Sequence, residues 1–242
     1  MPDPLAGRRP DPGFPPPWGP AEVALGLLAA VSLTILLVFA LTGVAGLVGL
    51  GESSVLLRYL AFVATEGCFV VVAAAALLLS GTGVEALGLR APTKSAVAVG
   101  EGLAVGALLV ALTRGWALAL ARWAPALHER LLAEEQRQID YLAGPWPLLL
   151  VAALLAAPAV EELFFRGFVF GGLRSRLDFP LASAASALVF ALIHLMPVSA
   201  PPLFVVGLGT AALYERHHSL LPSLTAHVTY NGIALAGSFL GW

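Results

Sequence analysis

The sequence has few charges, a single cysteine and no excess of basic residues. Charged residues make up 12% of its 242 residues, against about 25% in an ordinary soluble domain, which excludes a soluble globular protein. With 13 Lys and Arg against 15 Asp and Glu, no basic field could hold a nucleic acid, so DNA and RNA are excluded as partners. The lone Cys68 excludes an internal disulfide framework and a cysteine-based zinc site.

Apolar residues dominate instead, at 59% of the sequence. They form seven long runs separated by Gly, Pro or charge, and the alternating pattern of a β-barrel is absent. A helix crosses a bilayer with about 20 apolar residues and satisfies its own backbone. The sequence therefore predicts an all-α, polytopic membrane helical bundle with about seven transmembrane helices. The runs lie at about 21–50, 55–79, 95–120, 147–171, 180–196, 200–214 and 219–240.

Two segments differ from these runs. Residues 1–20 hold eight of the 18 prolines and predict a Pro-rich flexible tail that neither forms a helix nor packs. Residues 121–144 form one long hydrophilic stretch with leucines near helical spacing, which predicts an amphipathic helix on the membrane surface. We expect its acids Glu134 and Glu135 to form a solvated face without chemistry.

The basic residues predict an orientation. Seven of them fall on one side of the predicted bundle and four on the other, which favours a cytoplasmic N-terminus. The first set is Arg8, Arg9, Arg90, Lys94, Arg174, Arg176 and Arg216, and the second is Arg58, Arg122, Arg130 and Arg137.

Two glycine pairs lie within predicted helices, Gly102 with Gly106 and Gly167 with Gly171. Small residues at this spacing let two membrane helices approach closely. We expect both pairs to be structural.

The fourth apolar run contains three ionisable residues, Glu161, Glu162 and Arg166. Each costs about 2.5–3.5 kcal/mol at the bilayer centre, so such residues usually have a function. Glu162 and Arg166 are spaced i, i+4 with the acid first, and can neutralise each other. Glu161 points about 100° away and has no such partner. One buried ion-pair network that holds helices together is the structural alternative.

Two further runs also carry polar groups. His194 ends the 180–196 run, while His227 and Asn231 share one face of the 219–240 run. Each alone fits a structural hydrogen bond between helices. However, a rise of 1.5 Å per residue places Glu161, His227, Asn231 and His194 about 9, 12, 18 and 21 Å from the cytoplasmic boundary. Because all four fall in the middle band of the membrane, we expect them to converge on one site.

These residues resemble the CPBP family, the group of intramembrane glutamic proteases that includes CAAX prenyl protease 2 and the bacteriocin-processing (Abi) proteins. The family pattern is Glu-Glu-x-x-x-Arg, Phe-x-x-x-His and His-x-x-x-Asn on successive helices. Here the three motifs are Glu161-Glu162 with Arg166, Phe190 with His194, and His227 with Asn231. They cover roughly residues 145–235, the motif-bearing core of an expected transmembrane protease domain over 21–242.

The resemblance implies roles for the motif residues. Glu161 would be the general base that activates a water together with His194, and His227 and Asn231 would donate hydrogen bonds to the oxyanion. Because Arg166 holds Glu162 ionised, Glu162 and Arg166 would support the site, along with Phe190. The family implies no metal and no cofactor. The partners would be a membrane-anchored protein or peptide substrate and the lipid bilayer of a bacterial inner membrane.

Three other readings stay open from the sequence. Glu161, His194 and His227 could supply three metal ligands of a metal-dependent protease. A non-catalytic membrane scaffold or immunity protein could retain the same constellation for packing. A transporter could use Glu66, an acid in the middle of the second run, in a proton path. The identity of the substrate, whether a prenylated protein, a bacteriocin or a sorting tail, and the oligomeric state are not predicted.

Overall fold

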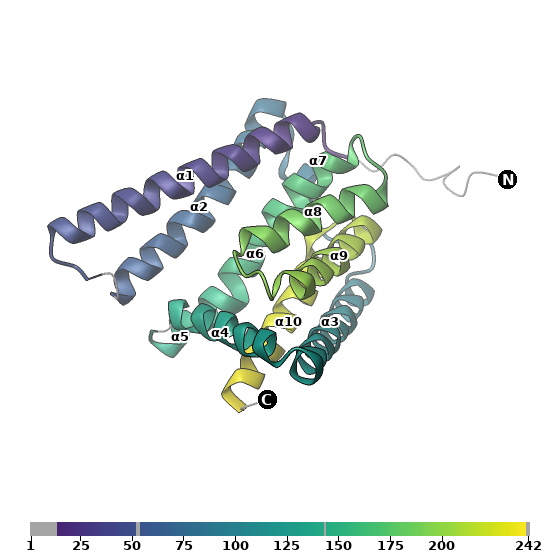
Figure 1. Cartoon of the computed structure of the whole chain (residues 1–242). Helices are drawn as coiled ribbons and strands as arrows, with labels where there is room; N and C mark the ends of the chain where they lie inside the picture. The colour runs from purple at the N-terminus through teal and green to yellow at the C-terminus, as the bar shows by residue number, and fades with distance from the viewer. Residues whose placement is uncertain (1–13, 52–53, 143, 241–242) are drawn as a thin grey trace.

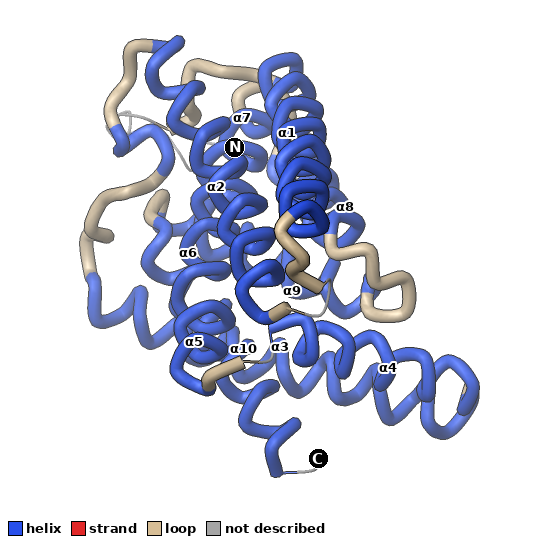
Figure 2. The backbone as a smooth tube through the Cα atoms, turned by 90° about the vertical axis from the view of Figure 1, so that its left-hand side faces the viewer, coloured by secondary structure: helices blue, strands red, loops and turns tan. Residues whose placement is uncertain are grey.

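A computed structural model describes residues 14–51, 54–142 and 144–240 of the chain. These residues form a bundle of helices and no strand (Figure 1). The all-α membrane bundle predicted from the apolar runs is therefore confirmed. In Figure 2 most helices run side by side, and α4 crosses one end of the bundle.

Four helices are long and apolar enough to cross a membrane: α1 (Pro20–Leu47), α2 (Val55–Ser80), α3 (Ser95–Trp123) and the helix from Trp146 to Arg174. Many of their apolar side chains, such as Phe39 on α1, are exposed on the surface of the protein, as contact with lipid requires. The chain is thus an integral membrane protein.

The three remaining runs form shorter or more polar helices. These are α8 (Phe179–Ile193), α9 (Ala200–His217) and α10 (Leu220–Leu240). Helix α8 has only 15 residues, and α10 contains His227 and Asn231 within its length. The expected total of about seven crossings stays a prediction, because only four helices are both long and apolar enough among the described residues.

Helices α3 and α10 pack closely at the predicted glycines. A Cβ atom built on Gly102 would lie 2.6 Å from the carbonyl oxygen of Pro222, and one on Gly106 would lie 2.6 Å from that of Ala226. Both distances are too short for a real side chain. The structural role predicted for this pair is confirmed, and it fixes α10 against α3 where α10 carries its motif.

The second glycine pair also permits close packing. A Cβ atom on Gly167 would lie 2.7 Å from the carbonyl oxygen of Leu87, and one on Gly171 would meet Pro16 at 3.2 Å. Leu87 belongs to a short 3-10 helix, η1 (Val84–Leu87). The helix from Trp146 to Arg174, here called the motif helix, therefore packs directly on the η1 backbone.

An aromatic core surrounds the motif helix. Phe69 stacks on Phe164 with 4.5 Å between ring centroids, and Phe165 meets the edge of Phe190 at 5.2 Å. All four side chains are buried. In a membrane such contacts stabilise helix association by close packing rather than by removal from water, so this cluster holds the helix that carries the two adjacent acids.

The segment before α1 differs in part from the flexible tail predicted for 1–20. Residues 1–13 lie outside the described residues, and α1 already begins at Pro20. Trp18 is only 4% exposed, and its indole Nε1 donates to the carbonyl of Phe168 at 3.0 Å. The proline-rich composition did not predict this packing. A single tryptophan has enough apolar surface to anchor the segment.

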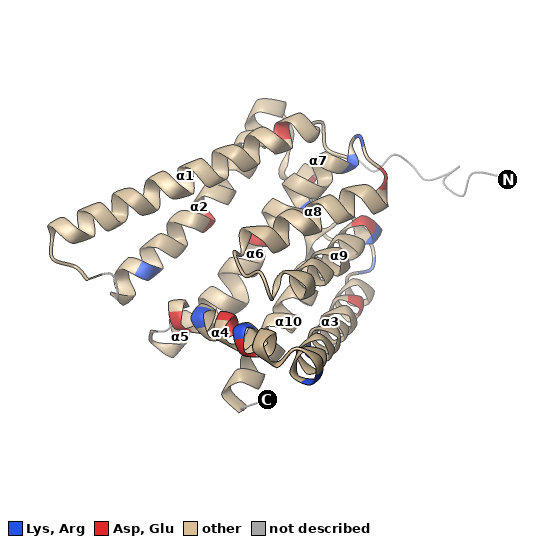
Figure 3. Ribbon diagram, in the orientation of Figure 1, with Lys and Arg blue, Asp and Glu red and all other residues tan. Residues whose placement is uncertain are grey.

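The hydrophilic stretch forms α4 (Pro125–Leu142), as the leucine spacing predicts. Figure 3 shows charged residues along α4 and near the helix ends of the bundle, with few along the middle of the other helices. The solvated face expected for both α4 acids is wrong for Glu134, which is 5% exposed. Leu131, on the same side of α4, is 2% exposed because this face packs onto the bundle.

Candidate active site

The motif helix is irregular on both sides of its acids. It runs through α5 (Trp146–Leu150), η2 (Val151–Ala156), α6 (Ala157–Glu162), η3 (Leu163–Phe170) and α7 (Gly171–Arg174). The segments η2 and η3 are π-helical. Such turns are rare and often occur at functional sites. The two glutamates end the short α-helical turn between them.

Pro158 has a direct effect on this backbone. In η2 the amide of Ala157 donates to the carbonyl of Ala152, a spacing of five residues. The same spacing would pair the carbonyl of Ala153 with residue 158, but proline has no N–H. The side chain of Asn231 takes that place, since its Nδ2 donates to the Ala153 oxygen at 2.9 Å. Because Pro158 has no N–H, the Ala153 carbonyl is left to accept from Asn231, and this bond connects α10 to the motif helix.

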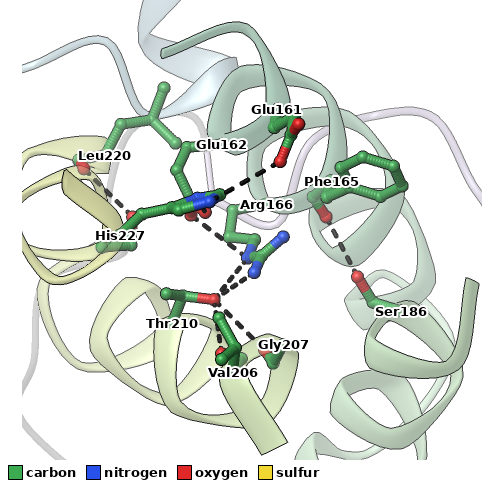
Figure 4. A network of polar contacts seen from close by, with 11 residues as sticks. Glu161, Glu162, Phe165, Arg166, Ser186, Val206, Gly207, Thr210, Leu220 and His227 are labelled. Atoms are coloured by element: carbon green, nitrogen blue, oxygen red, sulfur yellow. Dashed lines mark hydrogen bonds and ion pairs between the residues drawn. The ribbon is translucent and has the colours of Figure 1, made fainter. Parts of the chain in front are cut away.

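Glu162 and Arg166 form a fully buried ion pair. Arg166 Nε lies 3.1 Å from Glu162 Oε2, and both side chains are 1% exposed. The guanidinium also donates from Nε and Nη2 to Thr210 Oγ1 on α9 (Figure 4), and its carbon lies 4.7 Å from the centre of the Phe190 ring. Two charges removed from water need such partners, because an unpaired buried charge is strongly unfavourable.

His227 lies between the two glutamates. Its Nδ1 is 2.8 Å from Glu162 Oε1, a hydrogen bond, and its Nε2 is 3.7 Å from Glu161 Oε2 (Figure 4). A carboxylate accepts, so Nδ1 carries the proton of this bond. The other ring nitrogen, Nε2, is then directed to Glu161. It carries a lone pair in the neutral ring and donates a hydrogen bond in the imidazolium.

His194 caps the end of α8. Its Nδ1 lies 2.6 Å from the carbonyl oxygen of Phe190. A carbonyl oxygen can only accept, which places the proton on Nδ1 and leaves a lone pair on Nε2 of the neutral ring. The Phe190 ring meets the edge of both imidazoles, with centroid distances of 4.7 Å to His194 and 5.9 Å to His227.

A cavity of about 210 Å³ joins these groups. Glu161, His194, His227 and Asn231 all line it, from α6, the end of α8 and α10. The Glu161 side chain is 15% exposed. Glu162 and Arg166 are not among the lining residues. The volume is sufficient for several waters beside these polar groups. The structure therefore brings together the four residues expected to converge and separates the two adjacent acids.

Sequence reasoning missed a second polar group on the same cavity. It consists of side chains from α3, α4 and α10, namely Thr113, Arg114, Glu135 and Tyr230. Burial raises the pKa of the Glu135 carboxyl above its usual range, although the nearby Arg114 opposes this effect. The position of Arg114 inside an apolar run was a signal for it. Glu135 gave no such signal, because it lies in the hydrophilic stretch 121–144.

Two alternatives from the sequence can be compared with this geometry. No three His, Cys, Asp or Glu side chains gather as a possible metal site in the part of the chain that the structure describes. Glu66 lies on α2 with its Oε2 atom buried and without a hydrogen-bond partner. It is not among the residues that line the cavity.

Fold and site together define an integral membrane protein with carboxylate, imidazole and amide groups around one internal cavity. Comparison with known proteins then gives the family. Residues 143–233 match the Rce1-like family, described as type II CAAX prenyl endopeptidase Rce1-like. This range contains all three motifs, so the CPBP/CAAX relationship predicted from them is confirmed for this part of the chain.

One curated relative supports the same relationship. The chain is 27% identical over 85 residues to "Putative membrane peptidase YdiL" of Bacillus subtilis (strain 168). The alignment covers 35% of this chain and 35% of that protein, so the chain spans about a third of the relative's length. No solved structure matches the chain.

Proposed function

We propose that this chain is an intramembrane glutamic endopeptidase. It hydrolyses a peptide bond near the membrane, in a substrate held there by a lipid anchor or a membrane-embedded tail. The observation that carries the proposal is the convergence of Glu161, His194, His227 and Asn231 on one cavity. The match to CAAX-type endopeptidases over the same residues supports a proteolytic use of this arrangement.

Glu161 is the general base in this proposal. It takes a proton from a water whose oxygen attacks the carbonyl carbon of the substrate, and that proton later passes to the leaving amine as the C–N bond breaks. His194 shares in positioning this water, because its Nδ1 proton is held by Phe190 and its Nε2 is left to accept. A positioned acid–base group of this kind contributes about 10²–10⁴-fold to a rate.

His227 and Asn231 stabilise the oxyanion. One N–H of the Asn231 amide is used by Ala153, and the second can be donated into the cavity. His227 donates from Nε2 in its protonated form, whose charge the Glu162 carboxylate balances from the other side of the ring. Donors aimed at the developing charge in a site with little water are each worth about 10²–10³-fold.

Glu162, Arg166 and Phe190 support the site. The ion pair with Arg166 keeps Glu162 available to His227, while the Phe190 ring contacts Arg166 and both imidazoles. Residues 21–242 then form the protease domain, with 145–235 as its core. We place the chain in a bacterial inner membrane, as the family resemblance implies, and its N-terminus in the cytoplasm because more basic residues lie at that side.

The test uses the full chain in phosphatidylglycerol-containing vesicles with an internally quenched, prenylated peptide as the probe. Wild type should cleave the probe, and Glu161→Gln and His194→Ala should abolish cleavage while remaining folded. Glu129→Gln is the matched control, because Glu129 is exposed on α4. Comparing membrane proteomes of cells that carry wild type or Glu161→Gln extends the test to natural substrates, whose C-terminal tails should persist in the variant.

Two outcomes would contradict the proposal. Cleavage by Glu161→Gln at the wild-type rate would remove the glutamic mechanism. A Glu161→Gln protein that restores wild-type behaviour to a deletion strain, with no difference in processed tails, would instead favour a membrane scaffold or immunity protein.

A further inference from the structure

The carboxylate of Glu134 is buried, although it lies on the polar helix α4. It is 5% exposed and has three hydrogen-bond donors. Oε1 accepts from the amide of Val198 at 3.1 Å, and Oε2 accepts from the amide and the hydroxyl of Ser199, both at 2.9 Å. Buried acids are rare unless they are fully bonded, so these contacts account for its position.

Two of the three donors belong to Ser199 at the start of α9, and the third is the amide of Val198 in the preceding loop. Ser199 is the N-cap residue of this 18-residue helix. The first amides of a helix lack partners within it, and its dipole favours a negative charge there. Glu134 therefore supplies, from another helix, the acceptor that the beginning of α9 needs.

The same contacts hold the loop that follows His194. Only a few residues connect α8 to α9, and among them Leu195 has a φ of 55°, a left-handed conformation that is unfavourable for leucine. Such a conformation persists only where its surroundings enforce it. The surroundings here are Glu134 at residues 198 and 199, and Trp116 of α3, whose Nε1 donates to the carbonyl of Val198 at 3.3 Å.

We infer that Glu134 is a positioning residue of the candidate active site. It holds the α8–α9 loop in the conformation that keeps His194 at the cavity, and it fixes α4 as a wall of that cavity. Three α4 residues beside it, Glu135, Gln138 and Ile139, line the same space, as does its partner Ser199. The inference rests on the proposed function for its effect on catalysis, but not for the contact itself.

Glu134→Gln is the informative variant. It keeps the volume of the side chain, but its one acceptor oxygen cannot serve both sides of the carboxylate, and its amide group would face an N–H donor. Ser199→Ala removes only the hydroxyl donor and leaves both backbone bonds. Glu129→Gln makes the same chemical change as Glu134→Gln at an exposed position of the same helix and is the control.

Two measurements separate positioning from general stability. With the quenched prenylated peptide, Glu134→Gln should lower kcat about 10²-fold, as a small misplacement of a reacting group does, while KM stays near the wild-type value. Hydrogen–deuterium exchange should rise at residues 195–199, with little change elsewhere. Ser199→Ala should show smaller changes of the same kind, and Glu129→Gln should match wild type in both measurements.

The outcomes are distinguishable. Wild-type kcat or unchanged exchange at 195–199 in Glu134→Gln would overturn the inference. If Glu134→Gln does not fold, Ser199→Ala decides, and unchanged kcat and exchange in that variant would overturn it. If wild type and Glu129→Gln cleave no peptide while exchange still rises in Glu134→Gln, hydrolysis of a prenylated substrate fails and the positioning of the loop stands.

Discussion

His227 Nδ1 lies 2.8 Å from Oε1 of Glu162, and this hydrogen bond fixes which nitrogen of the imidazole is directed to the cavity. A free histidine exchanges its proton between two nitrogens. Here the buried carboxylate holds the proton on Nδ1 and directs Nε2 towards Glu161. The acid that is excluded from the cavity therefore determines the chemical state of a side chain within it.

Removal of one charge from the buried pair should destabilise the protein. Glu162→Gln leaves Arg166 charged and without its carboxylate, so we expect a loss of about 3–5 kcal/mol, with low yield or partial activity. The double variant Glu162→Gln/Arg166→Met removes both charges and should regain part of the stability. Thermal unfolding in detergent measures this difference. A double variant less stable than Glu162→Gln alone would contradict the argument, and full inactivation of a well-folded Glu162→Gln would reverse the roles of the two acids.

A methyl group at Gly106 should separate α10 from α3. Its Cβ would meet the carbonyl oxygen of Ala226 and the side chain of Thr229, so we expect Gly106→Ala to cost about 1–3 kcal/mol and to lower cleavage by displacing His227. Gly100, on the same helix, has nothing within 4 Å of such a Cβ. Gly100→Ala should be neutral or stabilise by up to about 1 kcal/mol. Equal effects of the two substitutions on unfolding would be inconsistent with this packing.

Asn231 and Pro158 should be coupled. Asn231→Ala leaves the half-buried Ala153 carbonyl without its donor, at about 0.5–1.5 kcal/mol, and should lower kcat about 10²–10³-fold by loss of an oxyanion donor. Pro158→Ala provides an N–H near that carbonyl, so the stability lost on Asn231→Ala should be smaller in this background. A double-mutant cycle of unfolding free energies measures the coupling. Strict additivity would show that the proline does not create the need for Asn231.

Chelators should not affect cleavage. A mechanism in which Glu161 activates the water needs no metal, so incubation with EDTA or 1,10-phenanthroline followed by desalting should leave the rate of probe cleavage unchanged. Metal analysis of the purified active protein provides the control. Loss of activity that returns on addition of a stoichiometric divalent metal ion would favour the metal-dependent protease.

The arrangement of the site residues could be predicted because each motif places a polar group at similar depth in an apolar helix. Glu161, His194, His227 and Asn231 were expected to converge, and they line one cavity. Periodicity also predicted the close packing at Gly102 and Gly106. Both inferences depend on residues whose cost is visible in the sequence. A polar side chain within a membrane helix is unfavourable, and glycine within a helix is unfavourable as well.

Other features left no such trace. Glu134 belongs to a helix where charge costs nothing in water, so only its contacts with Val198 and Ser199 reveal that it is buried. No sequence pattern marked the π-helical turns on either side of Glu161 and Glu162. The segment before α1 resembles a linker in composition, yet Trp18 is buried by contacts with residues 150 positions later in the chain.

Trp18 has a consequence for the two adjacent glutamates. Neighbouring positions on a helix point about 100° apart, so a rotation of the motif helix about its axis by one residue would turn Glu162 towards the cavity and turn Glu161 away from it. That rotation would break the bond from Trp18 to the Phe168 carbonyl and the close contact between Gly167 and Leu87. The residues ahead of the first helix thus help to select which acid faces the cavity, although they contain no part of the motifs.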